Sequence, residues 1–68
     1  MLTIEAEMEE DGRWIAEVID LPGTLVYGAT RKEAVAKAQA LALRVLADRI
    51  EHGEDVPEAA QHFMVVGV

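Results

Sequence analysis

The sequence predicts an α+β domain with the element order β-β-β-α-β, in which three antiparallel strands form a meander and one long helix packs on one face. Two observations predict this class. Short β-prone runs are separated by turn residues within 2–27, and residues 31–52 contain neither proline nor glycine and are rich in alanine and leucine. The chain has 68 residues, which is room for a single domain, 1–68.

The first two strands are expected to form a hairpin. In residues 2–9 apolar side chains at the even positions alternate with polar side chains at the odd positions, which is the period of a half-buried strand. Asp11 and Gly12 then supply the residues of a tight turn that needs positive φ. Residues 13–19 follow as the second strand, so the two strands pair antiparallel.

A third and a fourth strand complete the prediction. Residues 20–23, Asp-Leu-Pro-Gly, end the second strand, because proline fixes φ and removes a hydrogen-bond donor. A short third strand covers residues 24–27 and ends at Gly28. The apolar and partly β-branched residues 62–68 predict a short fourth strand. We expect it to be paired within its own sheet or across an oligomer interface, because an exposed apolar edge invites aggregation.

The helix has recognisable start and stop signals. Thr30 stands three residues before Glu33, which is the spacing of a capping box at the helix start. Gly53 ends the helix and Pro57 prevents its resumption. The expected length is about 33 Å at 1.5 Å per residue.

Two neighbouring faces of this helix are apolar. The stripe expected to lie on the sheet consists of Val35, Ala38, Leu41, Ala42, Val45 and Leu46. The flank beside it consists of Ala36, Ala40, Leu43, Ala47 and Ile50. One sheet needs only one stripe, so the flank is either an oligomer interface or a row of good helix formers in water. Leu43 and Ile50 favour the interface, to which we also assign Phe63 and Val65 of the predicted fourth strand.

The composition favours association as the means of stabilising so small a domain. The chain has no cysteine, and only His52 and His62 could serve as nitrogen ligands for zinc, so disulfides and structural metals are not expected. Hydrophobic residues make up 51% of the chain, which is more apolar surface than a monomer of this size can bury. We therefore expect an obligate homo-oligomer without a cofactor.

The charge distribution points to a basic protein partner. The net charge is −7, and residues 1–20 contain seven acidic residues and one basic residue. An acidic domain is repelled by phosphate backbones, which disfavours direct nucleic-acid binding. The amino-terminal residues lack the basic and apolar regions of a signal peptide, and no segment is apolar enough to span a bilayer, so we expect a cytoplasmic protein.

Candidate binding residues lie on the polar face of the first strand. Glu5, Glu7 and Glu9 share this face, and Glu17 of the second strand is expected beside them. We interpret the cluster as a solvated face that also forms an acidic docking surface. The alternative is a divalent-metal site of a nuclease-like remnant. Tyr27 is a further candidate contact for a partner, with a place in the core as the alternative.

Enzymatic activity is not expected. The chain contains no serine and no cysteine, so neither histidine has such a nucleophile to activate. The sequence therefore predicts no catalytic residues and favours a protein that works by binding.

The order of these signals resembles the HicB family of bacterial type II antitoxins over residues 2–57. In that family an aspartate-glycine loop with an aromatic residue, a proline-glycine turn, a glycine, a helix-opening threonine, and a final glycine and proline follow one another. The matching residues here are Asp11, Gly12, Trp14, Asp20, Leu21, Pro22, Gly23, Gly28, Thr30, Glu33, Ala34, Gly53 and Pro57.

The resemblance implies a degraded ribonuclease-H-like fold without catalytic power. It also implies neutralisation of a small basic ribonuclease toxin of the HicA type by binding. Full-length members carry a carboxy-terminal DNA-binding module, for which this sequence leaves no room after Val68, so operator binding is not expected. The alternatives are a freestanding oligomeric HicB-like protein without a toxin and the metal-binding remnant.

Overall fold

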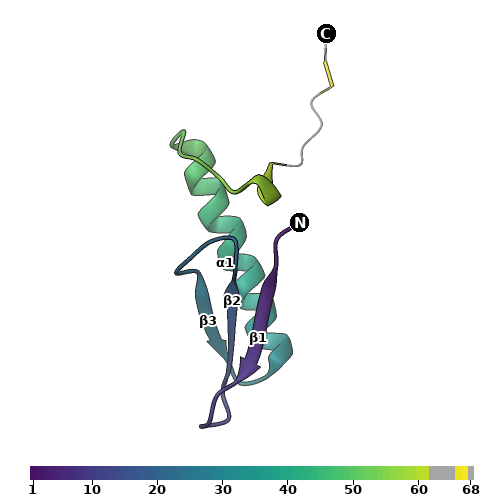
Figure 1. Ribbon diagram of the computed structural model, residues 1–68, viewed down its shortest axis with the longest axis vertical. Helices are drawn as coiled ribbons and strands as arrows, with labels where there is room; N and C mark the ends of the chain where they lie inside the picture. The colour runs from purple at the N-terminus through teal and green to yellow at the C-terminus, as the bar shows by residue number, and fades with distance from the viewer. Residues whose placement is uncertain (62–65, 68) are drawn as a thin grey trace.

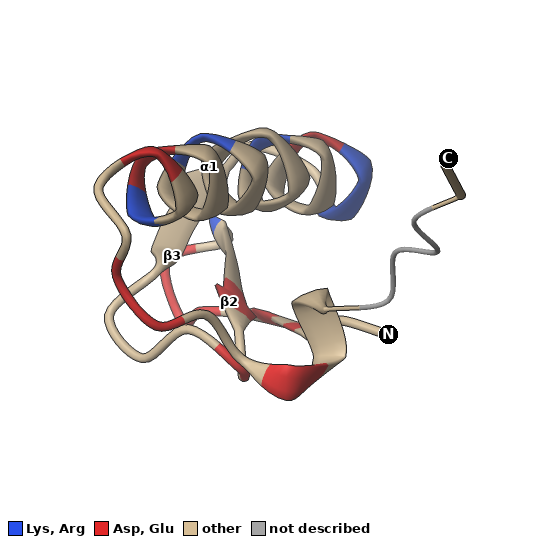
Figure 2. Cartoon of the chain, turned by 90° about the horizontal axis from the view of Figure 1, so that it is seen from above, with Lys and Arg blue, Asp and Glu red and all other residues tan. Residues whose placement is uncertain are grey.

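The computed structural model describes residues 1–61 and 66–67, and the structural statements that follow concern these residues. Three strands form one antiparallel sheet in the order β1-β2-β3, and one helix covers one of its faces (Figures 1 and 2). The elements are β1 (Ile4–Met8), β2 (Trp14–Val18), β3 (Leu25–Gly28), α1 (Arg31–Glu51) and a short 3₁₀ helix, η1 (Glu58–Ala60).

The predicted α+β class and the three-stranded meander with one long helix are confirmed. The predicted fourth strand falls mainly on residues 62–65 and 68, which lie outside the described residues, and so do the expected interface residues Phe63 and Val65. No helix within the described ranges is long and apolar enough to cross a membrane.

The turn between β2 and β3 contributes to the core as well as reversing the chain. Leu21 is completely buried, although the sequence indicates only a turn at residues 20–23. The turn is closed by the backbone amide of Thr24, which donates to the carbonyl of Leu21 at 2.9 Å, and by the amide of Val18, which donates to the carbonyl of Thr24 at 2.9 Å. The turn thus contributes a large apolar side chain to the core cluster that also contains Leu46 of α1.

Helix α1 begins as its sequence predicts. The backbone amide of Glu33 donates to Thr30 Oγ1 at 3.1 Å, and the amide of Ala29 donates to Glu33 Oε1 at 3.4 Å. The Lys37 ammonium lies 3.0 Å from Glu33 Oε1. The hydrogen bond from Lys37, and then the one from Ala29, hold the pKa of Glu33 below its ordinary value. The helix start is thus held by a reciprocal cap and one ion pair.

The other end of α1 closes with a Schellman motif. Gly53 has a φ of 69°, a conformation that side chains with a Cβ rarely adopt. Its backbone amide donates to the carbonyl of Ile50 at 3.2 Å, and the amide of Glu54 donates to the carbonyl of Arg49 at 2.8 Å. These two bonds satisfy carbonyls that would otherwise lack a partner at the helix end.

The core between helix and sheet is thin. Four of its members are spaced every fourth residue along α1, from Ala34 to Leu46. The buried stripe therefore begins one residue earlier than the predicted stripe and consists mainly of alanine. Gly28 permits this close packing, because a Cβ at that position would lie 2.6 Å from the backbone nitrogen of Ala34. The buried apolar residues are Ala16, Val18, Leu21, Ala34, Ala38, Ala42 and Leu46.

The apolar flank of α1 is largely exposed in the single chain. Leu43 is 66% exposed and Ile50 is 55% exposed, although both are large apolar side chains. Ala36 and Ala47 are exposed as well, and Ala40 is half-buried. The flank is therefore available for a contact, and the homo-oligomer remains a prediction.

Candidate protein-interaction surface

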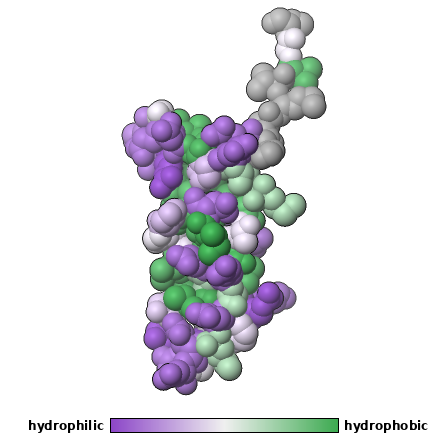
Figure 3. Space-filling view, viewed as in Figure 1, coloured by the Kyte–Doolittle hydropathy of each residue, from purple (hydrophilic) through white to green (hydrophobic). Residues whose placement is uncertain are grey.

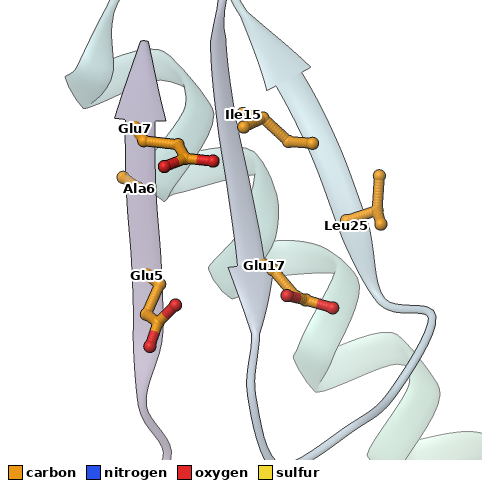
Figure 4. Close-up of a pocket in the computed structure, with 6 residues that line it drawn as sticks. All are labelled: Glu5, Ala6, Glu7, Ile15, Glu17 and Leu25. Atoms are coloured by element: carbon orange, nitrogen blue, oxygen red, sulfur yellow. The ribbon is translucent and has the colours of Figure 1, made fainter. Parts of the chain in front are cut away.

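The face of the sheet opposite α1 is open. Ala16 and Val18 of β2 are buried under the helix, so the residues that alternate with them project from the opposite face. Figure 4 shows side chains from all three strands on this face, and Figure 3 shows apolar atoms in its middle between polar ones. We define the outer sheet face as Glu5, Glu7, Ile15, Glu17, Leu25 and Tyr27.

The strand register arranges the outer sheet face in two rows across the strands. Five of its members, together with Ala6, line a shallow depression of about 380 Å³. Carboxylates occupy the β1 side, and apolar or aromatic side chains occupy the β3 side. The surface therefore suits a partner that presents basic groups next to apolar ones. The rows are Glu5–Glu17–Leu25 and Glu7–Ile15–Tyr27.

The carboxylates of this face form no ion pair in the part of the chain that the structure describes. Glu5 lies directly opposite Glu17 in the β1–β2 register. Like charges at directly opposed positions of an antiparallel pair are unfavourable. None of the ion pairs found among residues 1–61 involves Glu5, Glu7 or Glu17. A cationic side chain placed between the two strands would therefore relieve a repulsion as well as form an ion pair.

Tyr27 lies on the β3 side of the outer sheet face, and its ring contacts the guanidinium of Arg13. The guanidinium carbon of Arg13 is 4.4 Å from the centroid of the Tyr27 ring, a cation–π distance. Arg13 Nε also lies 2.7 Å from Asp11 Oδ2, and its backbone amide donates to Asp11 Oδ1 at 3.0 Å. These hydrogen bonds, the backbone one first, lower the pKa of Asp11. The tyrosine is thus oriented while 40% of its surface stays exposed.

The sequence-predicted contact residues are only partly brought together. Glu5, Glu7, Glu17 and Tyr27 all belong to the outer sheet face. Glu9 follows the last residue of β1, where its backbone amide donates to the carbonyl of Arg13 at 2.7 Å. No group of three or more histidine, cysteine, aspartate or glutamate residues within the described ranges is placed to hold a metal ion. The metal-site alternative therefore gains no support from this geometry.

The sequence did not predict two apolar members of the outer sheet face as partner contacts. Ile15 and Leu25 stand opposite acidic residues in the register, and Leu25 is 41% exposed. The available signal was the position of Ile15 in β2, where it shares the phase of Glu17 rather than that of the buried Ala16. An apolar residue in the polar phase of a strand can mark a contact surface.

A second, apolar groove runs between β1 and α1. Its volume is about 210 Å³, and Leu43 is the one member of the predicted helix flank that lines it. The lining residues are Leu2, Ile4, Val18, Gln39, Ala42 and Leu43.

Comparison with known proteins finds no match for this chain. No family model, no curated protein and no solved structure matches the chain. The fold and its surfaces define a small α+β protein with an open-faced sheet, and the functional argument rests on those surfaces.

Proposed function

We propose that this chain is a non-enzymatic protein-interaction domain of the HicB antitoxin type, which neutralises a small basic ribonuclease toxin by binding it. The observation that carries the proposal is the outer sheet face, where unpaired carboxylates adjoin exposed apolar side chains on one continuous surface. The proposal includes a fourth strand in residues 62–68, a degraded ribonuclease-H-like arrangement and a homo-oligomeric, cytoplasmic protein.

Two further observations support the proposal, one concerning the fold and one concerning the partner. Gly28 packs against the first turn of α1, and Thr30 and Glu33 cap that helix. Three of the residues that carry the resemblance to HicB therefore have a structural role in this fold. The net charge of −7 favours a basic partner. The negative field would speed encounter with such a toxin, and burial of Ile15, Leu25 and Tyr27 would hold the complex.

The mechanism is occlusion. A ribonuclease toxin must expose cationic groups to bind the RNA backbone. Carboxylates on β1 and β2 would occupy those groups, while the apolar side of the outer sheet face excludes water from the contact. Binding of this kind blocks RNA access without any covalent step.

The test first asks whether a small basic protein is encoded beside this gene, and then uses that protein in a binding assay and in a growth-rescue assay. Two variants with the same change in net charge are compared, because they separate local contacts from the overall field. One neutralises the outer sheet face, with Glu5→Gln, Glu7→Gln and Glu17→Gln. The other neutralises exposed carboxylates after the helix, with Glu54→Gln, Asp55→Asn and Glu58→Gln.

We expect the outer-face variant to lose affinity on the order of tenfold or more, and the control variant to lose much less. Rescue of toxin-expressing cells should fall in the same order. Equal losses in the two variants, or no binding by the unaltered protein, would show that the outer sheet face is not a toxin-binding surface.

One observation favours a second candidate, a freestanding oligomeric HicB-like protein without a toxin. Leu43 and Ile50 are large apolar side chains on α1 that stay mostly exposed in the single chain, and contact with another copy would bury them. Absence of a small basic neighbour protein together with a stable oligomer would favour this candidate.

A further inference from the structure

We propose that the free edge of β1 and the apolar groove beside it take up residues 62–68 of a second copy of this chain as an added β-strand. The inference does not depend on a toxin. It concerns a different surface from the outer sheet face, and it names the occupant of that surface.

The backbone of β1 offers an edge for one more strand. The amide of Ile19 donates to the carbonyl of Thr3 at 2.9 Å, and the amide of Glu9 donates to the carbonyl of Arg13 at 2.7 Å. Odd-numbered residues of this segment therefore direct their backbone groups toward β2. Because backbone groups alternate along a strand, Ile4, Ala6 and Met8 direct theirs to the opposite side. Among the described strands, only β2 pairs with β1.

An apolar groove follows the same edge. Leu2 and Ile4 form its wall on the β1 side, and Ala42 and Leu43 form its wall on α1. A strand added to β1 would direct every second side chain into this groove, because side chains of adjacent strands project to the same faces of a sheet. The addition would also cover Leu43, which is 66% exposed in the single chain.

The charges on β1 disfavour the simplest alternative, which is pairing of β1 with β1 of a second copy. Glu5 and Glu7 project from the outer sheet face, so antiparallel pairing of two β1 strands would bring four carboxylates together. Residues 62–68, His-Phe-Met-Val-Val-Gly-Val, carry no acidic side chain and are rich in residues that favour strands. This segment can lie beside Glu5 and Glu7 without repulsion.

Two observations favour a second copy over the chain's own segment. Val66 is 84% exposed, so this residue is not packed against its own chain. In addition, Leu21 and Val18 are the only large side chains among the described residues that are fully buried. A domain with so small a core gains most by burying apolar surface against another copy. Exchange of the segment between two copies would fill both grooves.

The test is sedimentation velocity of the full chain at micromolar concentration, with variants matched on the helix. Leu43→Glu introduces a charge into the groove, whereas Ile50→Glu introduces the same charge on an exposed apolar residue of α1 that does not line it. Val65→Asp alters the incoming segment. We expect the unaltered chain and Ile50→Glu to be dimers. We expect Leu43→Glu and Val65→Asp to be monomers that keep the helical signal of α1 in far-ultraviolet circular dichroism.

Mixing the two monomeric variants separates exchange between copies from docking within one copy. A groove-altered chain still supplies an intact segment, and a segment-altered chain still supplies an intact groove, so a mixture should form a heterodimer with one complete contact. Amide hydrogen exchange at Ala6 should slow at least tenfold in the unaltered dimer relative to the monomeric variants.

A monomeric full chain would overturn the proposal. So would a dimer that Ile50→Glu breaks and Leu43→Glu does not, because the helix flank would then be the interface. Failure of the mixture to associate would indicate that each chain docks its own segment. If a variant unfolds, amide exchange in the unaltered chain still tests the proposal. Rapid exchange of the Ala6 amide would show that no strand is added to the free edge of β1.

Discussion

The substitution Leu21→Ala removes the largest side chain that the fold buries completely. Leu21 is 0% exposed, and it packs in a cluster whose helix side is mainly alanine. Leucine-to-alanine changes in protein cores cost about 2–5 kcal/mol, and the cost rises with the cavity left behind. Alanines cannot extend into the space, so we expect a loss of about 3–4 kcal/mol. A domain of this size has a total stability of about 3–10 kcal/mol.

Urea unfolding followed by far-ultraviolet circular dichroism measures this loss. All samples must have the same protein concentration, because association makes apparent stability depend on concentration. Leu25→Ala is the matched control, since Leu25 is 41% exposed and lies on the outer sheet face. We expect the control to lose about 1 kcal/mol or less. Equal losses for the two leucines, or a loss below about 1 kcal/mol for Leu21→Ala, would refute the assignment of Leu21 to the core.

Three further outcomes are expected. Gly28→Ala should cost about 2 kcal/mol or more in urea unfolding, because the added Cβ would lie 2.6 Å from a backbone nitrogen of α1, and an unchanged stability would contradict the close contact. Thr30→Ala should cost about 1 kcal/mol by removing the cap, and Thr30→Ser should restore most of it; equal stabilities of the two variants would contradict the capping role. Hydrogen bonds lower the pKa values of Asp11 and Glu33 in the folded chain, so their stabilisation is complete above about pH 5 and is lost as the pH falls through the lowered values. The double variant Asp11→Asn and Glu33→Gln should therefore show a weaker fall in stability between about pH 5 and pH 3 than the unaltered chain, and an unchanged pH profile would remove these carboxylates from the explanation.

Local signals in the sequence account for most of the secondary structure. Thr30 and Gly53 bound the helix to within a residue, because capping depends on residues that are neighbours along the chain. The burial of Leu21 was not predictable in the same way. Its turn sequence describes the backbone, whereas its burial depends on where α1 crosses the sheet.

The sequence predicts the acidic half of the candidate surface but not its apolar half. The alternation of residues 2–9 places Glu5 and Glu7 on one face, and the structure agrees. The apolar half of the outer sheet face depends on the pairing of β2 with β3, which puts Leu25 opposite Glu17. The register of β2 and β3 is set by the geometry of the turn that joins them and is not encoded in the period of either strand, so this half could not be predicted.

The alanine-lined contact between α1 and the sheet has a consequence for motion. Alanine has no side-chain rotamers to lose on burial, so docking the helix costs little side-chain entropy. The same contact buries little apolar area, so undocking the helix also costs little. Because the core lies in this contact, separation of the helix from the sheet exposes that core and amounts to opening of the whole domain. Amides in the middle of α1 and in β2 should therefore exchange through one common, low-energy opening.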